Sequence, residues 1–300
     1  MGALLKNPRI KKTAAPDLAH RWIRDLRGLL GAEHLAVSEV RVGVFYTAAQ
    51  ISTGHVGVAF TPRMPNDSVC CPKSAAAAPP AGTLAGCDAW ELALFAIALA
   101  PLRRSVGVAV LNALSALAIE RHGTPGGHLE RGLDALDAAE IGPHDQVVMV
   151  GAFTPFLKKL KGNVAGLRVI DNHPEALKPD ELGIWCSPYK AAEALAGANV
   201  VIISGSALVE GDLDALLLST TNARRVVLAG PTASPWPPTF FESGIDVLGG
   251  LRVLDAPKIM QIVAEGGSGY FFGDAAEKVC IVSGGGACAL RLTQAGSYDE

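Results

Sequence analysis

The sequence is poor in charged and aromatic residues, and it has no apolar run long enough to cross a membrane. Charged residues make up 18% of the 300 positions and aromatic residues 6%. The formal net charge of -3 gives no electrostatic case for a nucleic-acid partner. The most apolar run, 92–102, ends at two arginines and is far shorter than the roughly 20 residues of a membrane span. We therefore expect neither nucleic acid nor a membrane as a partner.

Several other signals are missing as well. The positive charges near the beginning are not followed by the apolar segment of a secretion signal, so we expect a cytoplasmic protein. The six cysteines include no C-x-x-C pair and are expected to be thiols rather than disulfides. The sequence has no G-x-S-x-G elbow and no P-loop. Whether the protein catalyses a reaction therefore stays open.

Hydrophobic residues are abundant, at 49%, and their spacing predicts two domains. Apolar residues at helical spacing predict a helix over 17–30, with Asp17 as its N-cap. Residues 37–60 read as two strands of a hairpin that turns around 52–54, and a long loop follows. Two apolar helices, at about 88–100 and 103–120, are separated by Pro101. We predict a smaller α+β domain over residues 1–125.

The second half alternates short apolar strands with helices. The Gly- and Pro-containing stretch 122–128 reads as the linker, and an amphipathic piece follows at 129–139. Helices are expected to begin at Thr154-Pro155, at Ser187-Pro188 and near Asp212, and a last helix spans 257–266. The strands are expected at 146–151, 167–171, 199–205 and 224–230, with a fifth at 245–254. This alternation predicts a Rossmann-like α/β domain with a parallel sheet over residues 126–300.

Small and polar residues follow four of these strands. Because the carboxyl ends of parallel strands meet at one edge, we expect these residues to line one concave ligand site. The buried amide of Asn112, inside an apolar helix, is expected to reach a backbone group, the other domain or the ligand, and we favour the domain interface. The expected ligand-binding residues are Asn112, Gly151, Phe153, Thr154, Pro155, Phe156, Asp171, Asn172, Gly205, Ser206, Glu210, Gly230 and Thr232.

The site could serve a nucleotide or a metal. Asp171 lies 20 residues after Gly151, where a ribose-binding acid would lie, but no G-x-G-x-x-G is present and two phenylalanines crowd the loop. For a metal, we expect Asp171, His173 and Glu210 as ligands, which suit a harder ion than thiolates do. Cys70 and Cys71 form a weaker, softer alternative.

Four stretches resemble a known family: VGAFTPF (150–156), VIDNHP (169–174), residues 198–217 and residues 226–250. It is the uncharacterised two-domain family labelled "putative heavy-metal chelation", in which an enolase-N-terminal-like domain precedes a Rossmann-like domain. The first half matches more loosely, through 42–50, 54–60 and 106–116. This chain departs from the family pattern at Ser204 and Ala207, where threonines are expected, at Glu210, where asparagine is expected, and at Asp171, where glutamate is common.

The resemblance implies that the protein binds or chelates a metal, or a metal-linked small molecule, in the cleft between its domains. The resident cofactor is not identified by the sequence; a transition or heavy metal ion is the expected kind. The alternative is an enzyme that holds a nucleotide-like cofactor, either a methyl donor or a dinucleotide, between Gly151 and Asp171. The sequence leaves assembly into a homo-oligomer open.

Overall fold

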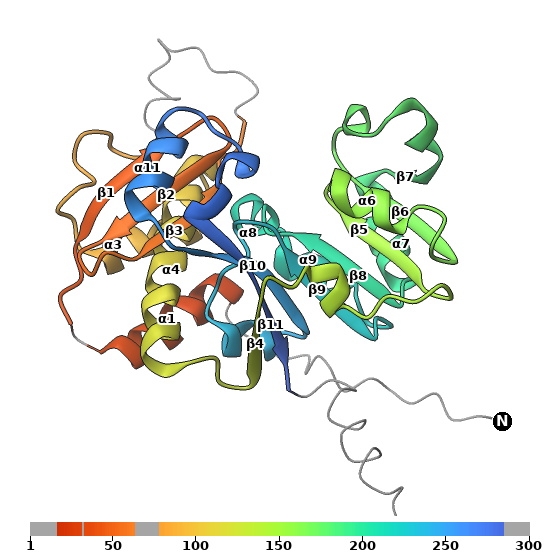
Figure 1. Ribbon diagram of the computed structural model, residues 1–300, viewed down its shortest axis with the longest axis horizontal. Helices are drawn as coiled ribbons and strands as arrows, with labels where there is room; N and C mark the ends of the chain where they lie inside the picture. Colours follow the sequence, from red (N-terminus) through yellow and green to blue (C-terminus); the bar gives the residue numbers. More distant parts are fainter. Residues whose placement is uncertain (1–16, 32, 64–77, 285–300) are drawn as a thin grey trace, which may run out of the picture.

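A computed structural model describes residues 17–31, 33–63 and 78–284 and contains two β-sheets (Figure 1). The small sheet is antiparallel, with the order β1-β2-β3, and the large sheet has the order β4-β11-β10-β9-β8-β5-β6-β7. The strands of the small sheet are β1 (Val37–Val42), β2 (Tyr46–Ile51) and β3 (Val56–Phe60). The strands of the large sheet are β4 (Gly127–Arg131), β5 (Gln146–Val150), β6 (Gly166–Ile170), β7 (Trp185–Cys186), β8 (Val200–Ser204), β9 (Arg225–Ala229), β10 (Val247–Val253) and β11 (Ala276–Ser283).

The helices are short, apart from one. The α-helices are α1 (Leu18–Leu30), α3 (Ala89–Ala93), α4 (Pro101–His122), α5 (Ala135–Ala138), α6 (Thr154–Leu160), α7 (Ala191–Ala196), α8 (Ala207–Glu210), α9 (Leu213–Leu218), α10 (Pro237–Phe241) and α11 (Ala256–Ala264). The 3-10 helices are η1 (Leu94–Ile97), η2 (Pro174–Ala176), η3 (Pro179–Ile184), η4 (Pro188–Lys190), η5 (Gly269–Phe271) and η6 (Gly273–Ala275). As predicted, Asp17 caps α1, its carboxylate accepting a hydrogen bond from the His20 N–H.

Six neighbouring strands of the large sheet, from β7 to β10, run parallel. Their apolar residues are buried on both faces, which explains the near-continuous Val and Ile runs in the sequence. Counted along the chain from β5, their order is 3-2-1-4-5-6, the order of a Rossmann sheet. The predicted Rossmann-like sheet is confirmed, as is the predicted parallel pairing of β5 with β6.

The small sheet lies between two helices. One face packs on α4, and the other packs on α11, which comes from the far end of the chain. Gly57 lets β3 approach α4 closely, since a Cβ there would overlap the Ala109 carbonyl oxygen. Among the described helices, α4 alone is long and apolar enough to span a membrane, but 72% of its apolar window is buried. It is the central core helix of this half.

The two halves of the chain exchange helices. While α11 covers the small sheet, α1 packs between α4 of its own half and α10 of the second half, where Trp22 meets Phe240 edge to face at 5.2 Å. The backbone N–H of Leu18 donates to the carboxylate of Asp214, 3.2 Å away. The chain passes from the small sheet to the large one between β3 and β4. A division into domains at residue 125 stays a prediction.

Three local predictions were wrong. Residues 37–60 form three strands rather than two, because the chain turns at Gly43, whose backbone lies against the Val263 carbonyl of α11. Strand β4 covers the end of the predicted linker, 122–128, and the beginning of the predicted amphipathic piece, 129–139. It pairs with β11, so that β11 has a neighbour on each side. Thr154 is the first residue of α6 rather than its cap, and Phe153 holds the N-cap position.

Candidate functional site

The carboxyl ends of β5 and β8 lie side by side at the point where the strand order of the large sheet reverses. Rossmann-like folds bind their ligands at this point. Gly151 follows β5 with a φ of +90°, and a Cβ there would lie 2.9 Å from the Cβ of Ser204. Gly205 follows β8, and a Cβ there would lie 3.0 Å from the Ala233 nitrogen. Both glycines therefore permit a close backbone approach at this edge.

An aromatic ring covers part of this edge. The Phe153 ring lies against Gly230: a Cβ added at Gly230 would lie 3.5 Å from the ring. The same ring stacks on Phe156, with ring centroids 5.2 Å apart. Phe153 therefore bridges the ends of β5 and β9 as an apolar wall. A dinucleotide needs bare backbone here to admit its pyrophosphate. This ring disfavours the nucleotide-like cofactor.

Asp171 joins the loops that follow β5 and β6. One carboxylate oxygen accepts a hydrogen bond from the Ala152 N–H at 2.9 Å, and the other accepts from the His173 N–H at 2.8 Å. The Trp185 indole N–H donates to the Asp171 carbonyl at 3.0 Å. The acid at this position thus fixes the shape of the edge, and its remaining lone pairs are available to a cation.

Glu210 ends the short helix α8, where Arg104 of α4 holds the backbone. The guanidinium donates to the carbonyl oxygens of Val209 and Glu210, both at 2.6 Å. Although Glu210 is exposed, partial desolvation raises the pKa of its carboxyl, and the negative charges of Asp212 and Asp171 raise it further, against the opposing effects of Arg104 and His173. Burial also raises the pKa of Asp212. The site is acidic on this side.

Asn112 and Thr232 connect the two halves. The Asn112 amide donates to the carbonyl oxygens of Val58, at 2.8 Å, and of Thr232, at 2.9 Å. The Thr232 hydroxyl accepts from the Phe60 N–H at 2.9 Å. The prediction that Asn112 reaches across to the second half is confirmed. Both side chains are nearly fully buried, so they shape the site from beneath.

The Thr232 hydroxyl gives a direct test of this connection. In Thr232→Val the shape is kept but the partly buried Phe60 N–H loses its acceptor, which costs about 1–3 kcal/mol. We expect urea denaturation to show a loss of that size. Thr53→Val, at an exposed turn position, is the matched control and should change stability by less than about 0.5 kcal/mol. Equal effects in the two variants would show that the hydroxyl contributes nothing to docking.

The remaining predicted residues are less tightly grouped. His173 is largely exposed and lies 2.9 Å from the Glu175 carboxylate. Asn172 is exposed, whereas Ser206 is half-buried and its N–H donates to the Ser204 hydroxyl. Within 17–31, 33–63 and 78–284, no three His, Cys, Asp or Glu side chains are grouped closely enough to hold a metal ion. The structure therefore does not assemble Asp171, His173 and Glu210 into a ready ligand set, and Cys70 and Cys71 lie outside the described residues.

Sequence reasoning missed Arg104. In the sequence Arg104 indicates only the end of an apolar run, yet in the structure it holds α8 and faces the acidic side of the site. The available signal was its place in the first turn of a helix that begins at Pro101. An arginine there is free to reach another element, because no preceding turn covers it.

Fold and site together define a Rossmann-like protein with an added small sheet and a glycine-lined, partly acidic edge. Residues 134–281 and 27–115 match two models that both carry the description "Putative heavy-metal chelation". The chain belongs to this family. Its fold is similar to the crystal structure of a DUF364-family protein of unknown function from Pyrococcus horikoshii (TM-score 0.68, 20% identity, covering 89% of this chain and 100% of that one).

Two further relatives agree. A DUF364-family protein of unknown function from Desulfitobacterium hafniense has a TM-score of 0.67 and 22% identity, covering 89% of this chain and 98% of that one. The protein named Uncharacterized protein MJ0500 from Methanocaldococcus jannaschii is 26% identical over 180 residues, or 59% of this chain. The match spans 65% of the length of that curated relative. These likenesses support the fold; the likeness of the small domain to an enolase N-terminal domain stays a prediction.

Proposed function

We propose that this protein binds a metal ion, or a small organic molecule that carries one, at the carboxyl edge of the large sheet. The observation that carries the proposal is the Glu210 carboxylate. The Glu210 residue is exposed and, within the described chain, its carboxylate has no hydrogen-bond partner and no ion pair, while partial desolvation and the two neighbouring acids Asp212 and Asp171 raise its pKa. A bound cation would offset this repulsion, so the edge favours a positively charged ligand.

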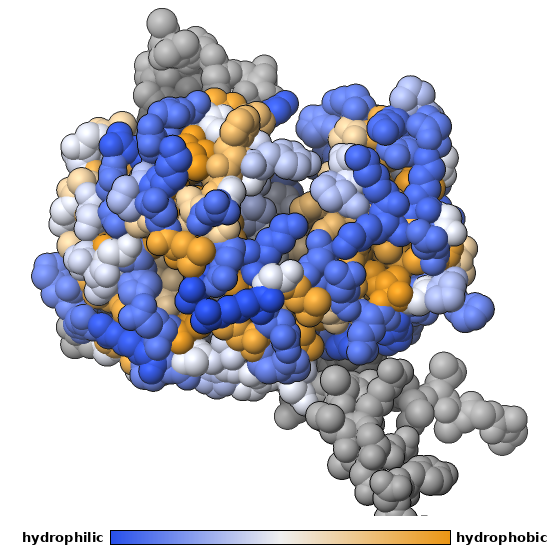
Figure 2. Space-filling view, viewed as in Figure 1, coloured by the Kyte–Doolittle hydropathy of each residue, from blue (hydrophilic) through white to orange (hydrophobic). Residues whose placement is uncertain are grey.

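The chemistry of the neighbouring groups fits a metal-linked small molecule. Glu210 and the remaining lone pairs of Asp171 are oxygen ligands, and the exposed His173 imidazole can add nitrogen. Phe153 would offer the organic part an apolar wall. The ligand would enter from the notch between the η5–η6 segment and the part with α6 and β7 (Figures 1 and 2). The family description agrees with this proposal.

The proposal is tested by titrating Zn²⁺ into protein without an affinity tag, by calorimetry. Glu210→Gln should weaken binding at least about tenfold, because it removes a ligand charge worth roughly 1.4 kcal/mol or more. Glu242→Gln, an exposed acid beside α10, is the matched control and should bind as the parent does. Unchanged Zn²⁺ affinity in a folded Glu210→Gln variant would refute the placement.

A second titration separates the carboxylate site from the thiolate alternative. If Cys70 and Cys71 hold the metal, the double variant Cys70→Ser/Cys71→Ser should abolish the binding of Cd²⁺, which prefers sulfur, while Glu210→Gln leaves it intact. For Zn²⁺ the proposal expects the opposite result: Glu210→Gln weakens binding and the double cysteine variant leaves it intact. The cysteine pair is the metal site only if the double cysteine variant loses both metals and Glu210→Gln keeps both.

A further inference from the structure

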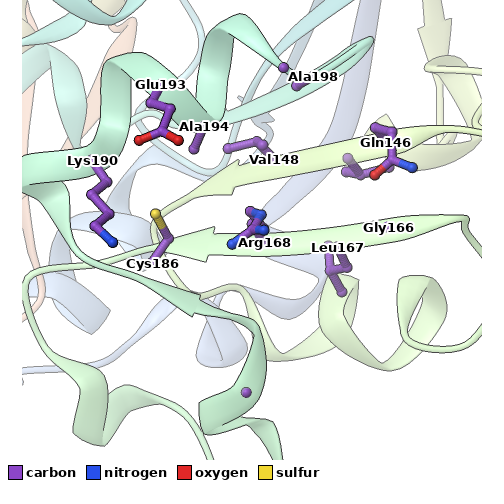
Figure 3. Close-up of a pocket in the computed structure, with 13 residues that line it drawn as sticks. Gln146, Val148, Gly166, Leu167, Arg168, Cys186, Lys190, Glu193, Ala194 and Ala198 are labelled. Carbon is purple, nitrogen blue, oxygen red and sulfur yellow. The ribbon is translucent and has the colours of Figure 1, made fainter.

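A hollow lies on the large sheet, away from the carboxyl edge. It has a volume of about 560 Å³ and lies over β5 and β6, beside α7 (Figure 3). Its lining includes Gln146, Arg168, Cys186, Lys190 and Glu193. Along β6, Arg168 precedes Asp171 by three residues, which corresponds to roughly 10 Å of strand, so the hollow is separate from the site described above.

The hollow lies on the face of the sheet that α7 covers. The crossover from β6 to β7, through η2 and η3, packs on the opposite face with α6, through Leu177 and Ile184. The neighbouring helix α7 lines the hollow with Ala194, and Gly197 and Ala198 follow it, so small residues leave the space open. A volume of this size is in the range of small-molecule sites.

The strand beneath the hollow departs from its apolar pattern. Leu167 and Val169 pack on the opposite face of the sheet with α6, whereas Arg168 projects into the hollow. A parallel strand that is covered on both faces would carry an apolar residue here. Gly166 has no side chain, so the Gln146 amide lies directly across it and adds a neutral polar group to the floor.

Two cations face this space without a protein partner. Among the described residues, neither the Arg168 guanidinium nor the Lys190 ammonium forms an ion pair or a hydrogen bond. Lys190 extends from η4 and Glu193 from α7 on the same side, toward the strands (Figure 3). With Glu193 as the one acid in the lining, the charges sum to +1. The planar guanidinium suits bidentate contact with a carboxylate or a phosphate.

We propose that this hollow is a second ligand site, for a small anionic molecule held by Arg168 and Lys190. The Gln146 amide would donate to the same anion or to a neutral oxygen beside it. Glu193 would accept from a donor group elsewhere on the ligand, so a molecule that carries both an acid and an N–H or O–H group fits best. The site is independent of the metal proposed at the carboxyl edge.

The test uses ¹⁵N-labelled full-length protein titrated with inorganic phosphate and, separately, with succinate. Both anions should shift amide signals around Arg168, Lys190 and Gly197. The anion that binds more tightly shows whether the site prefers a phosphate or a carboxylate. Arg168→Gln and Lys190→Gln should each weaken that binding about tenfold, the loss expected for one charge-assisted contact. Lys258→Gln, an exposed lysine on α11, is the matched control and should change nothing.

Other results would overturn the proposal. Shifts that spread over exposed lysines on both sheets, or that survive Arg168→Gln, would mean non-specific anion binding. If parent protein self-associates in sedimentation and Arg168→Gln abolishes this, the face binds a second copy of the chain instead. Glu210→Gln should leave the phosphate and succinate shifts unchanged, so a failure here and a failure at the metal site are distinguishable.

Discussion

Gly57→Ala should lower the free energy of unfolding by about 3 kcal/mol or more, among the larger effects of a single added methyl group. The new Cβ would overlap three backbone atoms of α4, from Ala109 to Ala113, and neither strand nor helix can yield without losing its own packing. Urea denaturation followed by circular dichroism measures the loss. If the variant gives no soluble protein that unfolds cooperatively, the loss of stability is larger than expected and the prediction still holds.

The matched control is Gly28→Ala in α1, where a Cβ meets no atom within 4 Å. Alanine should stabilise that helix by about 0.5–1 kcal/mol, because glycine is the poorer helix former. The two substitutions are chemically identical, so an opposite sign isolates the contact with α4. A Gly57→Ala variant as stable as the parent would show that β3 and α4 are farther apart than the structure places them.

Asn112→Ala should cost about 2–5 kcal/mol, since it leaves two buried carbonyl oxygens without a donor and opens a cavity. The affected carbonyls belong to Val58 and Thr232, one on each side of the contact between the two halves. We expect the loss in thermal and urea unfolding alike. Near-native stability would mean that another donor reaches these oxygens.

The control for this variant is Asn222→Ala. Asn222 donates a hydrogen bond to the Ala196 carbonyl, but the bond is exposed, so water can replace it and the loss should stay below about 1 kcal/mol.

The same pair of variants also tests the candidate site. Because Asn112 supports the loop after β9, Asn112→Ala should also weaken Zn²⁺ binding more than Asn222→Ala does.

The parallel sheet was predictable because its signal is local. Strands β5, β6, β8 and β9 are short apolar runs in the sequence, and their carboxyl ends meet wherever such strands pair. The same reasoning placed Gly151, Asp171 and Gly205 near one edge. The role of Asn112 was also foreseeable, since a buried amide in an apolar helix must find a partner.

What could not be predicted depends on contacts between distant segments. The turn at Gly43 lies directly against the Val263 carbonyl of α11, over two hundred residues later in the chain. Strand β4 is defined by its pairing with β11 and has no strong pattern of its own. Asp171 was expected to reach a ligand, and its hydrogen bonds to Ala152 and His173 show that it first serves the backbone. The hollow at Arg168 depends on the small residues Ala194, Gly197 and Ala198, which lie more than twenty residues further along the chain.

The exchange of helices between the halves has a consequence for synthesis on the ribosome. Trp22 and the outer face of the small sheet emerge early, but their covers, α10 and α11, are made only at residues 237–241 and 256–264. The apolar surface of the first half therefore stays open to water until nearly the whole chain has left the ribosome. We expect nascent chains that stop before residue 237 to bind chaperones or aggregate, and only chains that include α11 to become resistant to protease.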